Sequence, residues 1–236
     1  MTYSTSLTNG ALLTSERERC LAPALLPLSP MIMTRTGDVS HPLRPANPVD
    51  EHYRRHLPEI HKTFSLRLID VEKDGERFHR WQNDPRIAAF WEYPFDRATL
   101  DGMIRERLGD PHCTPLIGCF DNQPFAYFEC YWVAEDRLAP YCDHGPFDQG
   151  VHVLVGETTH LGRANTVGWL NALSHYLFLR EPRCQTLFGE PRVDNRAILR
   201  YTHPLTAWRK RYEFDFPHKR SALLSCARRD FFEEST

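Results

Sequence analysis

Apolar and polar positions alternate with a clear period only from about residue 63 onward. The segment 64–70, FSLRLID, has its apolar residues on one side, as a half-buried β-strand does. By contrast, residues 1–62 are rich in Ser, Thr and Pro and show no period. We therefore expect a proline-rich N-terminal arm over 1–62, disordered in part, and a folded domain over 63–236.

Helical and strand-like spacings then follow one another to the end of the chain. Caps and turn residues delimit helices at about 74–81, 96–109, 165–180 and 195–202. Strands are expected at 64–70, 115–120, 125–133, 150–156, 184–190, 206–216 and 221–228. The order β-α-α-β-β-β-α-β-α-β-β predicts a mixed sheet with helices packed on it, an α+β or layered α/β fold.

Composition and charge narrow the class of protein. Of the 236 residues, 41% are hydrophobic and 25% are charged, as in ordinary globular proteins. With 29 basic and 31 acidic residues the formal net charge is -2, which argues against a surface that binds nucleic acid or membrane throughout. No apolar stretch approaches the roughly 18–20 residues of a membrane span, and no signal peptide or lipidation motif is evident.

Cysteine and histidine spacing gives no sign of a disulfide framework or a metal site. The 7 cysteines are odd in number and include no CxxC pair, which is typical of reduced thiols in the cytosol. The 12 histidines show no spacing typical of metal ligands. We therefore expect a cytoplasmic protein with no metal, no nucleic-acid partner and no membrane partner.

The stretch 150–157, GVHVLVGE, contains the first candidate for chemistry. His152 lies inside an otherwise apolar strand, where it is either a hydrogen-bonded core residue or a catalytic one. A glycine turn at Gly162 then leads into a helix, whose first backbone N–H groups suit a pyrophosphate. Arg163 could add a charge-assisted contact there. The alternative is an ordinary strand-to-helix turn.

Two carboxylates are further candidates. Glu190 ends a short apolar strand, and if that strand lies parallel to the one containing His152, the carboxylate could orient the imidazole or act as a base. The alternative is a glutamate that points into solvent. Glu129 shares the face of an aromatic strand with Tyr127 and Tyr131, so it lines a pocket or lies at a wet sheet edge. Other residues that could contact a ligand are Asn83, Trp91, Trp132, Lys219 and Arg220.

Six segments, in order and with distinct motifs, carry a resemblance that covers roughly 64–232. They are WQNDPRIAAFWE (81–92), FAYFECYW (125–132), DQGVHVLVGE (148–157), WLNALSHYLF (169–178), EPRVDNRAILR (190–200) and FDFPHKRSALL (214–224). Together they resemble the siderophore-biosynthesis branch of the GCN5-related N-acyltransferase (GNAT) superfamily. Enzymes of this branch serve the aerobactin, rhizobactin, alcaligin and desferrioxamine pathways.

The resemblance implies a mixed, mostly antiparallel sheet that is splayed between its fourth and fifth strands, with acyl-CoA in the cleft. The strands at 150–156 and 184–190 occupy those places in the expected order. His152 and Glu190 match the catalytic pair of the family. Residues that match its CoA-binding positions are Val153, Leu154, Val155, Gly162, Arg163, Ala164, Asn165, Thr166, Val167 and Asn195. The chain departs at Thr159, where relatives carry Arg or Gln, and Arg163 could supply that charge.

The function implied is transfer of an acetyl or succinyl group from acyl-CoA to the hydroxylated nitrogen of N6-hydroxylysine or an N-hydroxylated diamine. The product is a hydroxamate, and His152 would take up the proton with help from Glu190. The substrate is a small hydroxylamine, a siderophore synthetase or hydroxylase could dock, and the chain is expected to be a monomer or homodimer. One alternative is acylation of lysine by a longer acyl chain, as in the mycobactin pathway. Another is a non-catalytic acyl-CoA-binding module.

Overall fold

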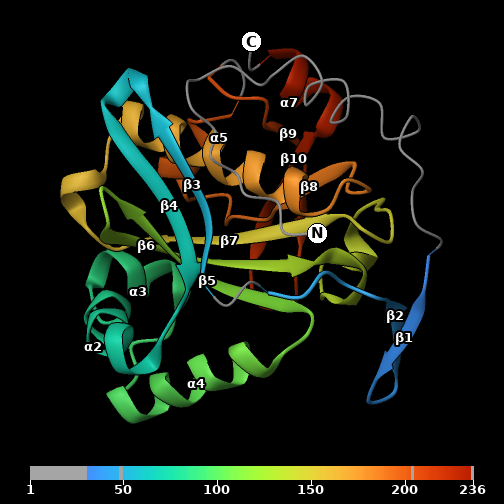
Figure 1. Ribbon diagram of the computed structural model, residues 1–236, viewed down its shortest axis with the longest axis horizontal. Helices are drawn as coiled ribbons and strands as arrows, with labels where there is room; N and C mark the ends of the chain where they lie inside the picture. Colours follow the sequence, from blue (N-terminus) through green and yellow to red (C-terminus); the bar gives the residue numbers. More distant parts are fainter. Residues whose placement is uncertain (1–30, 48–49, 203–204, 235–236) are drawn as a thin grey trace.

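Eight strands hydrogen-bond into one sheet that runs through the middle of the molecule (Figure 1). The computed structural model describes residues 31–47, 50–202 and 205–234. In spatial order the strands are β3 (Glu51–Leu57), β4 (Lys62–Leu68), β5 (Cys113–Phe120), β6 (Gln123–Trp132), β7 (Gln149–Val155), β8 (Thr186–Gly189), β10 (Arg220–Ala227) and β9 (Arg209–Asp215). Neighbours in this sheet pair antiparallel, except that β7 and β8 are parallel. A separate hairpin, β1 (Met33–Thr36) and β2 (Val39–Pro42), precedes it.

Helices cover both faces of the sheet (Figure 1). Helices α2 (Val71–Gln82), α3 (Pro85–Trp91) and α4 (Arg97–Gly109) pack on one face, and α5 (Arg163–Arg180) and α7 (Arg228–Glu234) pack on the other. Helix α6 (Arg196–Leu199) is a single turn, as are the segments Pro58–Ile60, Val133–Glu135, Ala139–Tyr141 and Thr158–His160. Among the described residues no helix is long and apolar enough to cross a membrane. The mixed sheet flanked by helices confirms the predicted fold class.

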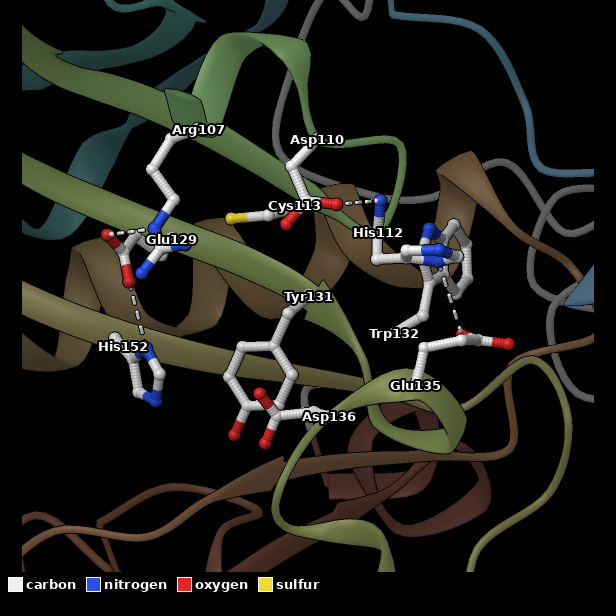
Figure 2. Close-up of a pocket in the computed structure, with 10 residues that line it drawn as sticks. All are labelled: Arg107, Asp110, His112, Cys113, Glu129, Tyr131, Trp132, Glu135, Asp136 and His152. Carbon is white, nitrogen blue, oxygen red and sulfur yellow. Dashed lines mark hydrogen bonds and ion pairs between the residues drawn. The ribbon is translucent and has the colours of Figure 1, made fainter. Parts of the chain in front are cut away.

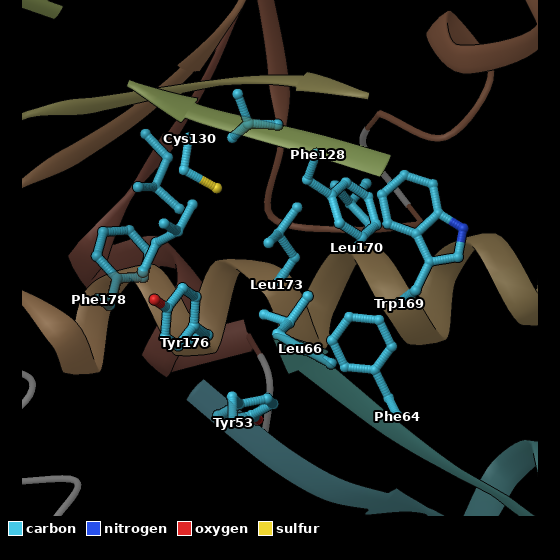
Figure 3. Packing of buried hydrophobic residues seen from close by; sticks show 14 of the residues in the cluster. Tyr53, Phe64, Leu66, Phe128, Cys130, Trp169, Leu170, Leu173, Tyr176 and Phe178 are labelled. Carbon is cyan, nitrogen blue, oxygen red and sulfur yellow. The ribbon is translucent and has the colours of Figure 1, made fainter. Parts of the chain in front are cut away.

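The main core lies between α5 and the sheet (Figure 3). Trp169 of α5 packs against Phe128 of β6 with their ring centroids 5.5 Å apart, and Phe64 of β4 joins the same cluster. Leu173 and Leu177 of α5 are at most 1% exposed. This packing fixes α5 across β4, β5 and β6, and thereby fixes the place of the helix N-terminus relative to β7.

Strands β7 and β8 pair over only two residue pairs, Gln149 with Leu187 and Gly150 with Phe188. Beyond Gly150, β7 continues to pair with β6 as far as Val155. From Val151 onward β7 therefore has no strand neighbour on its other side, which is the expected splay. With β3 included, the splay falls between the fifth and sixth strands of this sheet rather than the fourth and fifth.

Several element boundaries differ from the sequence expectation. The first strand of the sheet, β3, lies before position 63 and within the expected arm, where its irregular pattern gave no strand signal. Helix α2 begins at Val71 and not near Asp74, because Asp70 caps it by accepting from the backbone of Glu72 and Lys73. Asp74 is instead fully buried in ion pairs with Arg67 and Arg77. The segment 1–30 of the arm lies outside the described residues.

Helix α3 was not predicted, because Asp84-Pro85 follows the helix expected at 74–81 and a proline there is typical of a helix end. The same pair also starts a helix, since Asp84 caps it through the backbone N–H of Arg86 and Pro85 fits its first position. The short helices α3 and α7 are too brief to show a full apolar period.

A buried arginine ties the C-terminus of α5 to the end of β10. Arg228 is 2% exposed and donates to the backbone oxygens of Phe178, Glu181 and Cys184. Its positive charge therefore lies at the negative end of the helix dipole, where it also satisfies carbonyls that the helix leaves without partners.

Replacing Arg228 by Gln is expected to lower the free energy of unfolding by about 2–4 kcal/mol, because several buried carbonyls lose a charged donor. Urea unfolding followed by circular dichroism measures this. The neighbouring Arg229→Gln variant is the control, since that side chain is 80% exposed and pairs with Glu233 on the surface. Equal losses in the two variants would contradict the structural role of Arg228.

Candidate active site

The two glycines of GVHVLVGE make room for aromatic rings. A Cβ atom at Gly150 would lie 2.1 Å from Cζ of Tyr131, its partner on β6. A Cβ atom at Gly156 would lie 2.2 Å from the ring of Trp81. A side chain at Gly150 would displace the Tyr131 ring, whose hydroxyl holds a carboxylate of the site (below).

His152 lies between two carboxylates that come from different parts of the sheet. Its Nδ1 is 3.0 Å from Oε2 of Glu129 on β6 (Figure 2). Its Nε2 is 2.7 Å from Oε1 of Glu190, the residue after β8. A neutral imidazole has one N–H and could donate to only one of the two, whereas the imidazolium donates to both. Burial would lower the pKa of His152, but the charge of Glu190 and the hydrogen bonds of both carboxylates raise it from 6.5 to about 10.

Each carboxylate has further partners. The Tyr131 hydroxyl donates to Oε2 of Glu190 at 2.6 Å, and the Lys219 ammonium donates to the Glu190 backbone oxygen at 2.9 Å and lies 3.8 Å from Oε1. Burial would raise the pKa of Glu190, but the charges of His152 and Lys219 hold it at about 2.

Glu129 is held in the same way from the other side. The Tyr127 hydroxyl donates to its Oε1 at 3.0 Å, and Nε of Arg107 lies 3.4 Å from the same oxygen. Burial would raise the pKa of Glu129, but His152 and then Arg107 lower it. The result is a chain of alternating charge, Arg107–Glu129–His152–Glu190–Lys219.

Of the central three side chains, the imidazole is the most accessible. The His152 side chain is 23% exposed, against 11% for Glu129 and 0% for Glu190. It opens into a pocket of about 400 Å³, a figure that includes the solvent space at the mouth. The pocket is lined by Arg107, Asp110, His112, Cys113, Glu129, Tyr131, Trp132, Glu135, Asp136 and His152 (Figure 2).

The far wall of this pocket is held by the segment that precedes the sheet. Arg44 makes a bidentate contact with Glu135 at 2.8 and 2.7 Å, and its guanidinium lies 4.3 Å from the centroid of the Trp132 ring. Both side chains of the ion pair are at most 6% exposed. Residues expected to belong to a separate arm therefore form part of the site.

Two side chains reach the open edge of β7. Nε1 of Trp91 donates to the backbone oxygen of Val153 at 3.2 Å, and Arg86 donates to that of Val155 at 3.0 Å. These contacts show that Val153 and Val155 turn their backbone away from β6, because the direction alternates along a strand. Leu154, between them, turns its backbone toward its partner Tyr127.

Helix α5 begins at the other end of the splay. Gly162 has φ of 110° and precedes the first helical residue, a conformation that favours glycine. Lys62 of β4 lies there too, with its ammonium 3.0 Å from Oδ1 of Asn165. Arg163, expected to supply the missing charge, is exposed at the helix start. Sequence reasoning missed Lys62 because it lies a hundred residues from the glycine turn.

The structure brings together some of the sequence-predicted residues and not others. His152 contacts both Glu190 and Glu129 directly. The ring of Trp91 packs against the ring of His152, and Lys219 donates to the backbone oxygen of Glu190. Trp132 lines the pocket. Asn83 bonds the backbone of His79 and Phe95 at the end of α2, Arg220 pairs with Glu213, and Asn195 caps α6. Asn83 and Arg220 are not among the residues that line the pocket of Figure 2. Arg107 was missed because only packing of α4 brings it to Glu129.

Solved structures share this fold. An uncharacterized protein from Bacillus halodurans has a TM-score of 0.73 at 24% identity, over 79% of this chain and 94% of that one. The aminoglycoside acetyltransferase AAC(6')-Ib in complex with coenzyme A has a TM-score of 0.65 at 19% identity, over 73% of this chain and 99% of that one. At such identities the likeness concerns the fold alone. These structures therefore show that this chain shares their fold.

Residues 70–216 match the family described as the acetyltransferase (GNAT) domain, and the chain belongs to this family. The N(6)-hydroxylysine O-acetyltransferase of Escherichia coli is 41% identical over 90% of this chain and 67% of its own length. A putative lysine N-acyltransferase of Schizosaccharomyces pombe is 40% identical over 76% of this chain and 54% of its own.

A third relative comes from a fungus. The N(5)-hydroxyornithine:cis-anhydromevalonyl coenzyme A-N(5)-transacylase of Beauveria bassiana is 39% identical over 82% of this chain and 43% of its own. This chain thus spans two thirds of the bacterial relative and about half of each fungal one.

His152 is expected to titrate near pH 10 in the folded protein, which NMR of the imidazole carbons measures directly. Glu129→Gln keeps a hydrogen-bond acceptor but removes a charge, so it should lower the pKa of His152. Glu157→Gln is the control, because Glu157 pairs with Arg80 and not with His152. An unshifted pKa in Glu129→Gln would refute the electrostatic account.

The same shift links stability to pH. Because folding raises the pKa of His152, the imidazolium contributes to the free energy of unfolding. This contribution is complete below the unfolded pKa of 6.5 and is lost as the pH rises through about 10.

Proposed function

We propose that this protein transfers an acyl group from acyl-CoA to the hydroxylated nitrogen of a small amine and so forms a hydroxamate. The observation that carries the proposal is the partly exposed His152, held between Glu129 and Glu190 at the point where β7 leaves β8. The names of two relatives, which refer to hydroxylysine and hydroxyornithine, support this class of acceptor.

The splay and the start of α5 fit the donor substrate. Val153 and Val155 can offer backbone groups to the pantetheine arm, because they face the open side of β7. We do not assign Leu154 to the arm, since its backbone faces β6. Within the segment from Gly162 to Val167, the backbone N–H groups that precede Thr166 have no helical acceptor and are offered to the pyrophosphate, and Lys62 adds a positive charge beside them. The donor carries an acetyl or a succinyl group.

The charge state of His152 sets the order of proton transfers. An imidazolium with a pKa of about 10 cannot first act as a base near pH 7, as the sequence suggested. An N-hydroxylated amine is less basic than an alkylamine, so it can attack in its neutral form. We therefore assign His152 first as an acid and then as a base.

The step balances as follows. The acceptor nitrogen forms a bond to the acyl carbon while the carbon–sulfur bond of the thioester breaks. His152 gives its proton to the departing thiolate, and the resulting neutral imidazole takes the proton of the acylated nitrogen. Glu129 and Glu190 act as positioning residues, because they hold the imidazolium before and after the step and are themselves covered.

The proposal predicts release of one CoA thiol per hydroxamate when the protein is given acetyl-CoA and N6-hydroxylysine. Thiol release is followed with a disulfide reagent, and the hydroxamate by its coloured ferric complex. Because only nitrogen acylation gives a hydroxamate, thiol release without colour would indicate oxygen acylation instead. Turnover of unmodified lysine with long-chain acyl-CoA would support the mycobactin-like alternative. Binding of acyl-CoA without turnover would support a non-catalytic module.

His152→Gln should lower kcat by about 100- to 10,000-fold, since it removes the proton donor and acceptor of the step. His56→Gln is the control, because His56 is exposed on β3. Urea unfolding of both variants separates loss of chemistry from loss of fold. Full activity in folded His152→Gln would exclude a catalytic role for the imidazole.

The pH profile tests the order of transfers. If His152 acts first as an acid, kcat stays level from about pH 7 to 9 and falls as the pH passes through 10. If it acted first as a base, kcat would rise about tenfold per pH unit up to the same pKa. The sign of the slope between pH 8 and 10 therefore decides between them.

A further inference from the structure

The pocket beside His152 holds a guanidinium whose partners are few. Arg107 lies at the end of α4 and meets Glu129 only through Nε, at the long distance of 3.4 Å. Among the described residues no hydrogen bond engages its two terminal nitrogens, and its side chain is 34% exposed. In Figure 2 the guanidinium lies beside Glu129 at the same end of the pocket as His152.

The acidic side chains of the pocket fall into two groups. Glu129 and Glu135 are neutralised, the first by His152 and Arg107 and the second by Arg44. Asp110 and Asp136 each accept a backbone N–H, from His112 and Leu138, and neither is in an ion pair within the described part of the chain. Burial raises the pKa of Asp136, which an added cation would reverse.

The pocket thus offers one incompletely paired cation and two carboxylates without an ion pair. The head of an amino acid carries the opposite set, a carboxylate next to an ammonium. A diamine carries only the ammonium and would leave Arg107 unmatched. An Arg guanidinium binds a carboxylate through two parallel hydrogen bonds, and its terminal nitrogens are free to do so here.

The spacing fits a side chain of lysine length. Nε of Arg107 and Nδ1 of His152 bind different oxygens of the Glu129 carboxylate, which places these two nitrogens on the order of 8 Å apart. Five bonds of about 1.5 Å join the terminal nitrogen of lysine to its α-carbon, which spans roughly 6 Å. An acceptor nitrogen next to His152 can therefore place its α-carboxylate at Arg107.

We propose that Arg107 recognises the α-carboxylate of the acceptor, so that the protein selects an N-hydroxylated amino acid over an N-hydroxylated diamine. This assignment rests on the proposed function, since it names the acceptor of that same site. Asp110 and Asp136 receive the ammonium that both kinds of acceptor carry, and they do not discriminate between them.

The experiment compares two acceptors that differ by one group, N6-hydroxylysine and N-hydroxycadaverine, which lacks the carboxylate. The wild-type kcat/KM should be about 10- to 100-fold higher for hydroxylysine, as expected for one charge-assisted bidentate contact. Arg107→Gln should remove this preference, because it lowers kcat/KM for hydroxylysine, mainly through KM, by a larger factor than it lowers kcat/KM for hydroxycadaverine. Arg105→Gln, on the exposed side of α4, should leave both values unchanged.

The outcomes separate the two claims. No hydroxamate from either acceptor would overturn the proposed function and the inference with it. Equal kcat/KM values for both acceptors in the wild type would overturn the inference alone. An equal loss of kcat/KM for both acceptors in Arg107→Gln would also overturn the inference alone, because Arg107 would then act only through Glu129. If Arg107→Gln fails to fold, Arg107→Lys replaces it, since it keeps the charge but not the bidentate geometry and should narrow the preference.

Discussion

The ion pairs on either side of His152 are the interaction on which the site depends. Two carboxylates with little or no exposure flank one imidazolium, and each is backed by a second cation, Arg107 or Lys219. Removing a charge from water costs several kcal/mol, so no member of the chain is stable there without its neighbours. Because the members come from α4, β6, β7, the residue after β8 and the residue before β10, the site forms only when the sheet is assembled.

The splay gives this charged chain access to a substrate. If β8 followed β7 to Val155, the backbone of β7 would be satisfied by a strand, and Glu190 would not sit at the strand end beside the imidazole. The parting after Gly150 leaves Val153 and Val155 without a strand partner on that side, where Trp91 and Arg86 donate to their backbone oxygens, and it leaves His152 more exposed than either of its two carboxylate partners. Gly150 has a part in this, because it admits the ring of Tyr131 that holds Glu190.

Local signals in the sequence predicted much of this and failed where contacts are distant. Caps and turn residues correctly marked the helices expected at 96–109 and 165–180, whereas the splay was expected only from the family resemblance. The strand β3 was missed because its apolar and polar residues do not alternate regularly. Arg107 and Lys62 were missed for a different reason, since an exposed arginine on a helix and a lysine at a strand start have no local feature that reveals their partners.

The charge state of His152 is the clearest case of a property that no local pattern contains. In the sequence it is one imidazole among valines, which suggests a base with an ordinary pKa. Only the meeting of Glu129 and Glu190, 23 residues before it and 38 after it, makes it a cation at neutral pH. The same reasoning applies to the pocket wall, where Arg44 neutralises Glu135 from a segment that the sequence pattern separated from the domain. Because Glu135 is paired there, Asp110 and Asp136 are the pocket carboxylates left for an acceptor ammonium. The charges that meet the acceptor are therefore set by residues that lie far apart in the sequence.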